Sequence, residues 1–139
     1  MALLHLKSAT DFERVRRDGR SHAHPLVVLI ARPRGPAELL VRTPGRQSAP
    51  EPRPRFGFVA GRAVGPAVAR NRAKRLLREA ARALAATMAP GWDVLLIARR
   101  PLTEARLTET QAALSQLLRR ARLLAGPAPA PGERVVEPC

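Results

Sequence analysis

One long amphipathic segment constrains the fold of this chain more than any other part of its sequence. Pro66 can begin a helix, because the first helical N–H groups have no intrahelical partner, and Pro90-Gly91 ends it. Between these boundaries, helical spacing places a set of apolar residues on one stripe: Ala73, Leu76, Leu77, Ala80, Leu84 and Met88. The pattern predicts a helix over residues 66–88 that packs this stripe on a sheet.

The opposite side of this predicted helix is cationic. Residues 61–82 include seven basic side chains and a single acidic one, Glu79; the basic ones are Arg62, Arg70, Arg72, Lys74, Arg75, Arg78 and Arg82. Like charges at helical i, i+4 spacing repel, whereas arginine can make forked contacts to phosphate and stays charged. The pattern favours a phosphate-binding face, and a merely solvated charged face is the alternative.

The charge of the whole chain indicates the same class of partner. Its 139 residues carry 25 Lys+Arg and 11 Asp+Glu, a formal charge of +14, and this length predicts one domain. Nucleic acid is the leading partner and an anionic membrane surface a distant second. No apolar stretch is long enough to cross a bilayer and no signal peptide is visible, so we expect a soluble cytoplasmic protein.

Shorter patterns predict the remaining elements. Thr10 and Glu13 are spaced as a capping box for a first helix that ends near Gly19. Apolar, β-rich runs predict strands at 26–31, 38–42, 56–60 and 92–98, the first two paired as a hairpin, and a last helix over 108–124. The proline-rich segment 43–55 is predicted to be an insertion loop, and 126–139 a disordered tail.

The predicted order is therefore α-β-β-β-α-β-α. It indicates an α+β fold, a single-domain α/β sandwich over 1–125 in which helices pack on a mixed four-stranded sheet. A helix-turn-helix DNA-binding protein fits poorly, because strands separate the helices.

Residue patterns for protein-based catalysis are absent. No Ser-His-Asp arrangement, glycine-rich phosphate loop or zinc spacing occurs, and the single Cys139 excludes a disulfide framework. His22 and His24 could suggest a metal site, but a polar loop is the better interpretation. We therefore expect no catalytic residue, no metal ligand and no cofactor bound by the protein itself.

The central motif resembles a known signature. Arg70-Asn71-Arg72, followed by Lys74, Arg75 and Arg78 and preceded by Val64-Gly65 and Ala67-Val68, is similar to the signature of the bacterial ribonuclease P protein subunit. Leu6-Lys7, Asp11-Phe12 and Gly19 resemble the opening helix of that family, and 93–101 resembles its fourth strand. The resemblance extends over about residues 6–124.

The resemblance implies a function. In this family the RNA subunit is the catalyst and holds Mg²⁺, while the protein helps it to bind precursor tRNA, whose 5′ leader is removed. The family fold includes a left-handed β-α-β crossover. By position, the residues that would contact RNA are Arg62, Arg70, Asn71, Arg72, Lys74, Arg75 and Arg78. Those that would line a cleft for the leader, between the first helix and the sheet, are Phe12, Val28, Ile30 and Ala98.

Three departures from the family pattern affect this interpretation. Arg16 and Ile30 stand where the family usually has aromatic residues, whose stacking on a base is worth about 1–3 kcal/mol. Ala63 stands where a second basic residue often follows Arg62, and the 43–55 insertion is atypical. The alternative function is a non-catalytic structural RNA-binding protein, such as a ribosomal protein, since the basic helix alone fits it equally well.

Overall fold

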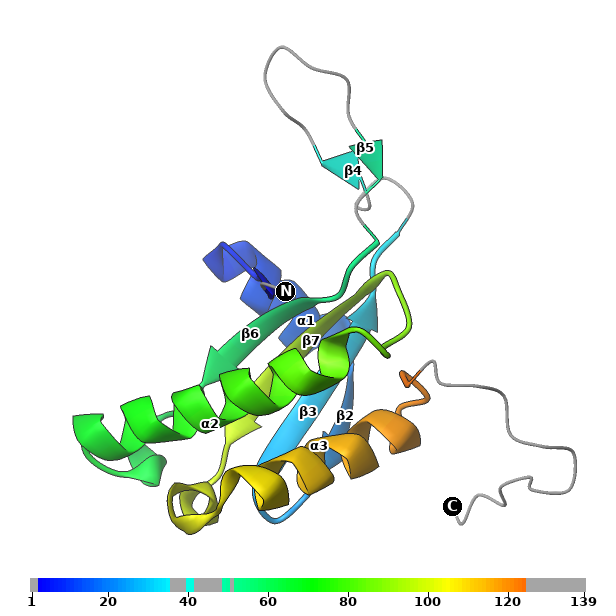
Figure 1. Cartoon of the computed structure of the whole chain (residues 1–139). Helices are drawn as coiled ribbons and strands as arrows, with labels where there is room; N and C mark the ends of the chain where they lie inside the picture. Colours follow the sequence, from blue (N-terminus) through cyan, green and yellow to red (C-terminus); the bar gives the residue numbers. More distant parts are fainter. Residues whose placement is uncertain (1–2, 36–39, 42–48, 51, 125–139) are drawn as a thin grey trace, which may run out of the picture.

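The computed structural model describes residues 3–35, 40–41, 49–50 and 52–124 (Figure 1). The helices are α1 (Ala9–Asp18), α2 (Ala67–Ala85) and α3 (Leu107–Arg120), with short 3₁₀ turns η2 (Arg62–Val64) and η3 (Arg100–Glu104). The strands are β1 (Leu4–His5), β2 (Arg20–Ala23), β3 (Val27–Pro33), β4 (Leu40–Val41), β5 (Ala49–Pro50), β6 (Arg55–Val59) and β7 (Trp92–Ala98).

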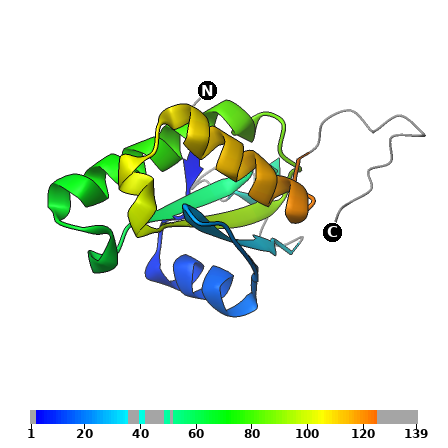
Figure 2. The same ribbon diagram turned by 90° about the horizontal axis from the view of Figure 1, so that it is seen from below.

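The described strands form a mixed sheet with helices on both faces. Its strand order is β1-β6-β7-β3-β2; β6 is parallel to β1 and β7, whereas β3 is antiparallel to β7 and β2. Figure 2 shows α2 and α3 side by side on one face and α1 on the other. The predicted α+β sandwich with a mixed sheet is confirmed, although the sheet has five strands and not four.

The connection from β6 through α2 to β7 has an unusual hand. In Figure 1, β6 and β7 run towards the lower left, α2 lies in front of the sheet, and β7 lies to the right of β6. When the view is rotated so that both strands point upwards, α2 still lies in front of the sheet and β7 lies to the left of β6. This is the left-handed crossover that the resemblance implies, contrary to the general right-handed rule.

The predicted hairpin between 26–31 and 38–42 is wrong. The antiparallel neighbours of β3 are β2 and β7, while β4 pairs with β5 in a separate two-stranded ribbon. Strand β2 was missed because its sequence, RSHA, is polar and mostly exposed. The predicted loop 43–55 includes β5 and the first residue of β6; residues 42–48 and 51, like the predicted tail 126–139, lie outside the described residues.

Helix boundaries differ slightly from the predicted ones. The N-cap of α1 is Ser8, whose side chain accepts a hydrogen bond from the Asp11 N–H at 3.1 Å, so the predicted Thr10 capping box does not form. Pro66 caps α2 as expected. The last helix ends at Arg120, four residues before its predicted end, and Arg122 then adopts a left-handed conformation with φ of 61°.

The core lies mainly between the sheet and the pair α2 and α3. Every second residue along β3 and β7 points to this side and is buried: Val27, Leu29, Ala31, Val94, Leu96 and Ala98. The apolar stripe of α2 packs on them. A smaller cluster of Leu6, Val15 and Leu95 lies on the opposite face, under α1.

A buried ion cluster joins the ends of three strands, and nothing in the sequence pattern predicted it. The Asp93 carboxylate, at the start of β7, accepts hydrogen bonds from Arg34 Nη1 at 2.9 Å and from Arg55 Nε and Nη2 at 2.9 and 2.8 Å. The Arg34 side chain is 1% exposed and also donates to the carbonyl oxygens of Trp92 and Arg53. Arg55 reaches Asp11 of α1 at 3.6 Å, so the cluster ties α1 to the sheet.

Candidate nucleic-acid interface

The cations of α2 occupy the sides of the helix that do not face the core. Helical spacing places Arg70, Lys74 and Arg78 in a row along one flank, where each is half-buried. We call these three residues the cationic flank. Partial burial of long side chains at such a flank covers their aliphatic stems and leaves the charged ends near water. The predicted residues Asn71 and Arg75 lie on the outer, exposed side of the same helix.

These cations lack carboxylate partners within the part of the chain that the structure describes. On α2 the one ion pair found there joins Arg82 to Glu79, at 2.8 Å. None of the other predicted basic residues lies within ion-pair distance of a described carboxylate; they are Arg62, Arg70, Arg72, Lys74, Arg75 and Arg78. Such a surface attracts polyanions, because their phosphates would relieve the mutual repulsion of the cations.

Arg72 and Arg70 differ from their neighbours. Arg72 Nε donates to the Thr103 carbonyl oxygen at 3.0 Å and its Nη2 to that of Ala105 at 3.1 Å, so Arg72 holds η3 against α2. Arg70 Nε is buried without a hydrogen-bond partner. An unsatisfied buried donor costs about 1–3 kcal/mol, so stability alone would not favour this arrangement.

Before α2, Arg62 is exposed on η2. Gly65 follows with φ of 142°, a conformation that L-residues rarely adopt, and it allows the chain to turn from η2 into α2. The Val64-Gly65 pair of the motif therefore has a backbone role, in which glycine sets the position of Arg62 relative to the helix.

Three of the four predicted cleft residues meet on the α1 side of the sheet. Phe12 of α1 and Ile30 of β3 are partly buried against the cluster of Leu6, Val15 and Leu95. Val28 is half-buried and has the same parity on β3 as Ile30, so it shares that face. The three side chains thus lie on the face of the sheet that α1 covers.

The predicted placement of Ala98 in this cleft is wrong. Ala98 is 6% exposed and belongs to the core on the opposite face of the sheet, where it pairs with the buried Val27. Its neighbour Ile97 pairs with Val28 and is partly buried against the α1 cluster, as is Val59 of β6. The sequence could have shown this, because side chains alternate between the two faces along a strand, so Ile97 and not Ala98 shares the face of Val28.

Gly57 of β6 sets how closely Phe12 approaches the sheet. A Cβ atom added at Gly57 would lie 2.6 Å from Phe12 Cε1 and 2.9 Å from Leu6 Cδ1. We predict that Gly57→Ala displaces the Phe12 ring and lowers the free energy of unfolding by about 1–3 kcal/mol, the usual cost of overpacking.

Urea unfolding monitored by circular dichroism measures this effect. Gly61→Ala is the matched control, because a Cβ there meets nothing within 4 Å. Equal stability of the two variants would show that the Phe12 ring does not depend on Gly57.

His22 lies in β2 and His24 in the turn that follows it, so the predicted polar loop includes His24 but not His22. His24 Nδ1 accepts a hydrogen bond from the Leu26 N–H at 3.1 Å. The pKa values of His22 and His24 are lowered, first by burial and then by the positive charge of Arg120; for His22, Arg20 adds to the effect. Among the described residues, no three His, Cys, Asp or Glu side chains are grouped closely enough to hold a metal ion.

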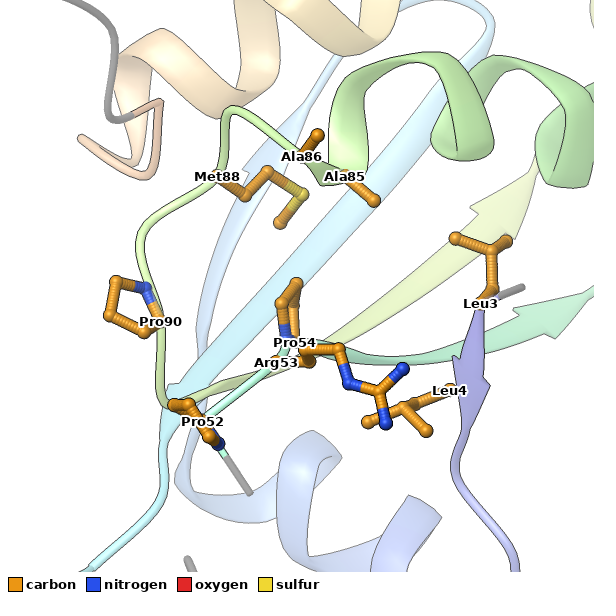
Figure 3. A pocket seen from close by; sticks show the side chains of 9 residues that line it. All are labelled: Leu3, Leu4, Pro52, Arg53, Pro54, Ala85, Ala86, Met88 and Pro90. Atoms are coloured by element: carbon orange, nitrogen blue, oxygen red, sulfur yellow. The ribbon is translucent and has the colours of Figure 1, made fainter. Parts of the chain in front are cut away.

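One cavity lies apart from both predicted sites. Its volume is about 250 Å³, and it opens between β1, the segment before β6 and the end of α2 (Figure 3). Most of its lining is apolar, including Leu3, Pro54 and Met88, and no predicted site residue lines it. In the described ranges of the chain, no helix is long and apolar enough to span a membrane.

Comparisons with known proteins identify relatives over nearly the whole chain. The family model "Ribonuclease P" matches residues 2–122. The ribonuclease P protein component of Herpetosiphon aurantiacus is 40% identical over 118 residues, which cover 85% of this chain and 84% of that protein. The corresponding protein of Roseiflexus castenholzii is 37% identical over 122 residues, 87% of this chain and 88% of the relative.

Solved structures agree with this match. The RNase P protein from Thermotoga maritima superposes with a TM-score of 0.66 at 26% identity, over 84% of this chain and 96% of that one. The Staphylococcus aureus RNase P protein gives a TM-score of 0.68 at 24% identity, over 86% of this chain and 96% of that one. The second likeness concerns the fold alone.

Proposed function

The chain belongs to the ribonuclease P protein family, and from this premise we propose that it binds the catalytic RNA through α2 and the 5′ leader of precursor tRNA through the α1 cleft. Membership of the family makes it the protein part of a ribonuclease holoenzyme with an RNA partner. The observation that carries the proposal is the set of α2 cations without described carboxylate partners.

The two proposed roles, binding of the catalytic RNA by α2 and of the leader by the cleft, follow from the chemistry of the two surfaces. Guanidinium groups bind phosphate oxygens by paired, charge-assisted hydrogen bonds, which position an RNA backbone without reading its sequence. The cleft offers Phe12 and the aliphatic side chains Val28, Ile30 and Ile97, which suit the faces of unpaired bases. Because Arg16 and Ile30 are not aromatic, Phe12 is the stacking residue available among the predicted positions.

The protein contributes positive charge, and not a catalytic group, to the cleavage step. Two RNA molecules that meet in the holoenzyme repel each other, and Mg²⁺ or protein cations can each screen that repulsion. We propose that the RNA subunit holds the Mg²⁺ ions needed for hydrolysis.

Neutralising α2 should therefore raise the Mg²⁺ requirement of the holoenzyme. We expect Arg75→Gln/Arg78→Gln to shift the midpoint of the Mg²⁺ dependence of precursor tRNA cleavage upwards by about two- to fivefold, because more Mg²⁺ must replace the lost charge. Arg72 is left unchanged because it also holds η3.

The matched control lies on the same helix. Glu79→Gln/Arg82→Gln removes a cation and its carboxylate partner together, so the net charge does not change. This control should keep the Mg²⁺ midpoint of the unaltered protein. If both double variants share one Mg²⁺ curve, α2 is not the surface that assists the RNA.

The alternatives from the sequence lose support. A helix-turn-helix protein needs two helices joined by a short turn, whereas α1 and α2 lie on opposite faces of the sheet, and β7 and η3 separate the neighbouring helices α2 and α3 along the chain (Figure 2). A structural RNA-binding protein such as a ribosomal protein would share the basic helix, but the family match over residues 2–122 does not favour it.

A further inference from the structure

A second group of cations gathers at the edge of the sheet formed by β2. Arg120, in the last turn of α3, donates from Nη1 to the Ala23 carbonyl oxygen at 2.8 Å. Arg99, directly after β7, donates from Nη1 to the His24 carbonyl oxygen at 3.4 Å. Together with the exposed Arg20, the first residue of β2, and the imidazole of His22, these residues follow β2 into the turn after it. We call them the basic edge: Arg20, His22, His24, Arg99 and Arg120.

The basic edge carries uncompensated positive charge. None of Arg20, Arg99 and Arg120 lies within 4.0 Å of a carboxylate oxygen of the described residues. Burial first, and then the positive charge of Arg120, lowers the pKa of His22 and His24, so both effects disfavour protonation of these imidazoles. The fold thus brings together cations that repel one another in the isolated protein.

The basic edge is separate from the cationic flank. Arg72 faces η3 and α3, and Arg70, Lys74 and Arg78 lie on the other side of the apolar stripe of α2, away from α3. The basic edge lies beyond α3, at β2 (Figures 1 and 2). Three strand spacings separate β6, below α2, from β2, which corresponds to about 14 Å. One phosphate group cannot contact both surfaces.

We propose that the basic edge is a second phosphate-binding surface, which contacts a segment of the catalytic RNA different from the one that α2 contacts. The Arg120 and Arg99 guanidinium groups each use one nitrogen in the contacts to β2 and the turn after it, and keep other N–H donors for phosphate oxygens. The inference rests on the proposed function, since the RNA partner is the same. It adds that the protein holds two parts of that RNA at a fixed separation.

The histidines make this contact sensitive to pH. A bound phosphate favours imidazolium, so it raises the pKa of His22 and His24 from their lowered values, and binding takes up protons. The charged groups that face them are Arg120 from α3, Arg20 from β2 and Arg99 after β7; the β3 partner of His22, Leu29, is apolar. Affinity for the RNA should therefore rise as pH falls from about 7.5 to about 6.

The test is equilibrium binding of the full chain to the catalytic RNA over a salt series. We expect Arg120→Gln to weaken binding by about three- to tenfold and to reduce the salt slope by about one, the value of one lost phosphate contact. Arg120→Lys, which keeps the charge, should retain most of the affinity. Lys7→Gln, an exposed cation between β1 and α1, is the control for a general loss of charge. His22→Gln should reduce the pH dependence of binding.

The outcomes separate this inference from the proposed function. If Arg120→Gln binds like Lys7→Gln while neutralisation of the cationic flank abolishes binding, α2 keeps its proposed role and the second surface is refuted. An Arg120→Lys variant as weak as Arg120→Gln, with lowered thermal stability in both, would assign Arg120 to holding Ala23 and also refute the inference. If the unaltered protein does not bind the catalytic RNA, both proposals fail.

Discussion

Asp93→Ala is expected to lower the free energy of unfolding by about 3–5 kcal/mol, the cost of leaving a buried charge without its partner. Asp93 is 1% exposed, and its carboxylate accepts hydrogen bonds from Arg34 and from both Arg55 nitrogens that face it. Without the carboxylate, the Arg34 guanidinium stays buried and loses its ion pair with Asp93. The loss should also release Arg55 and, through it, the tie to Asp11 of α1.

Chemical denaturation of the isolated protein measures this effect. Asp18→Ala is the control, since Asp18 is exposed and its pairs with Arg17, at 3.2 Å, and with Arg32, at 3.9 Å, are each worth at most about 1 kcal/mol. A loss for Asp93→Ala no larger than that of Asp18→Ala would show that the ion cluster does not support the fold.

Replacing all three residues of the cationic flank should have the largest effect on function. Arg70→Gln/Lys74→Gln/Arg78→Gln is expected to weaken binding to the catalytic RNA by about a hundred- to a thousandfold near 0.1 M salt, because each lost phosphate contact costs nearly tenfold there. If the unaltered protein engages ~6 phosphates, the slope of log affinity against log salt is about −4 to −5, and the variant should lose about two to three units of it.

A filter-binding or fluorescence titration over a salt series gives both quantities. Circular dichroism should show unchanged helix content, because the replaced side chains lie outside the apolar stripe. The Glu79→Gln/Arg82→Gln protein again serves as the control of equal net charge. A parallel downward shift with an unchanged slope would mean that the three cations do not contact phosphates.

The elements with strong periodicity could be predicted from the sequence. Helix α2 has an apolar stripe from Ala73 to Leu84, and β7 has an uninterrupted apolar run from Val94 to Ala98, so both were found within a few residues of their ends. Strand β2 has no such signal: its four residues, three of them polar, form a strand because they pair with β3, which is a tertiary effect. The hairpin prediction failed for the same reason, since 38–42 has the apolar, β-rich pattern of a strand and 20–23 does not.

The candidate site was predicted in part. Phe12, Val28 and Ile30 meet on one face of the sheet, whereas Ala98 lies on the other face, because a shift of one residue along a strand reverses the side. The pairs Arg34–Asp93 and Arg120–Ala23 are separated by 59 and 97 positions in the sequence. No local pattern contains such contacts, so the ion cluster and the basic edge became visible only in the fold.

Cleavage of a leader-bearing precursor tRNA by the catalytic RNA at low Mg²⁺, with and without this protein, tests the central claim most directly. We expect no cleavage by the protein alone and strong stimulation when it joins the RNA. Stimulation should be lost when the cationic flank is neutralised. An RNA that is active at high Mg²⁺ but gains nothing at low Mg²⁺ from the folded protein would contradict the account.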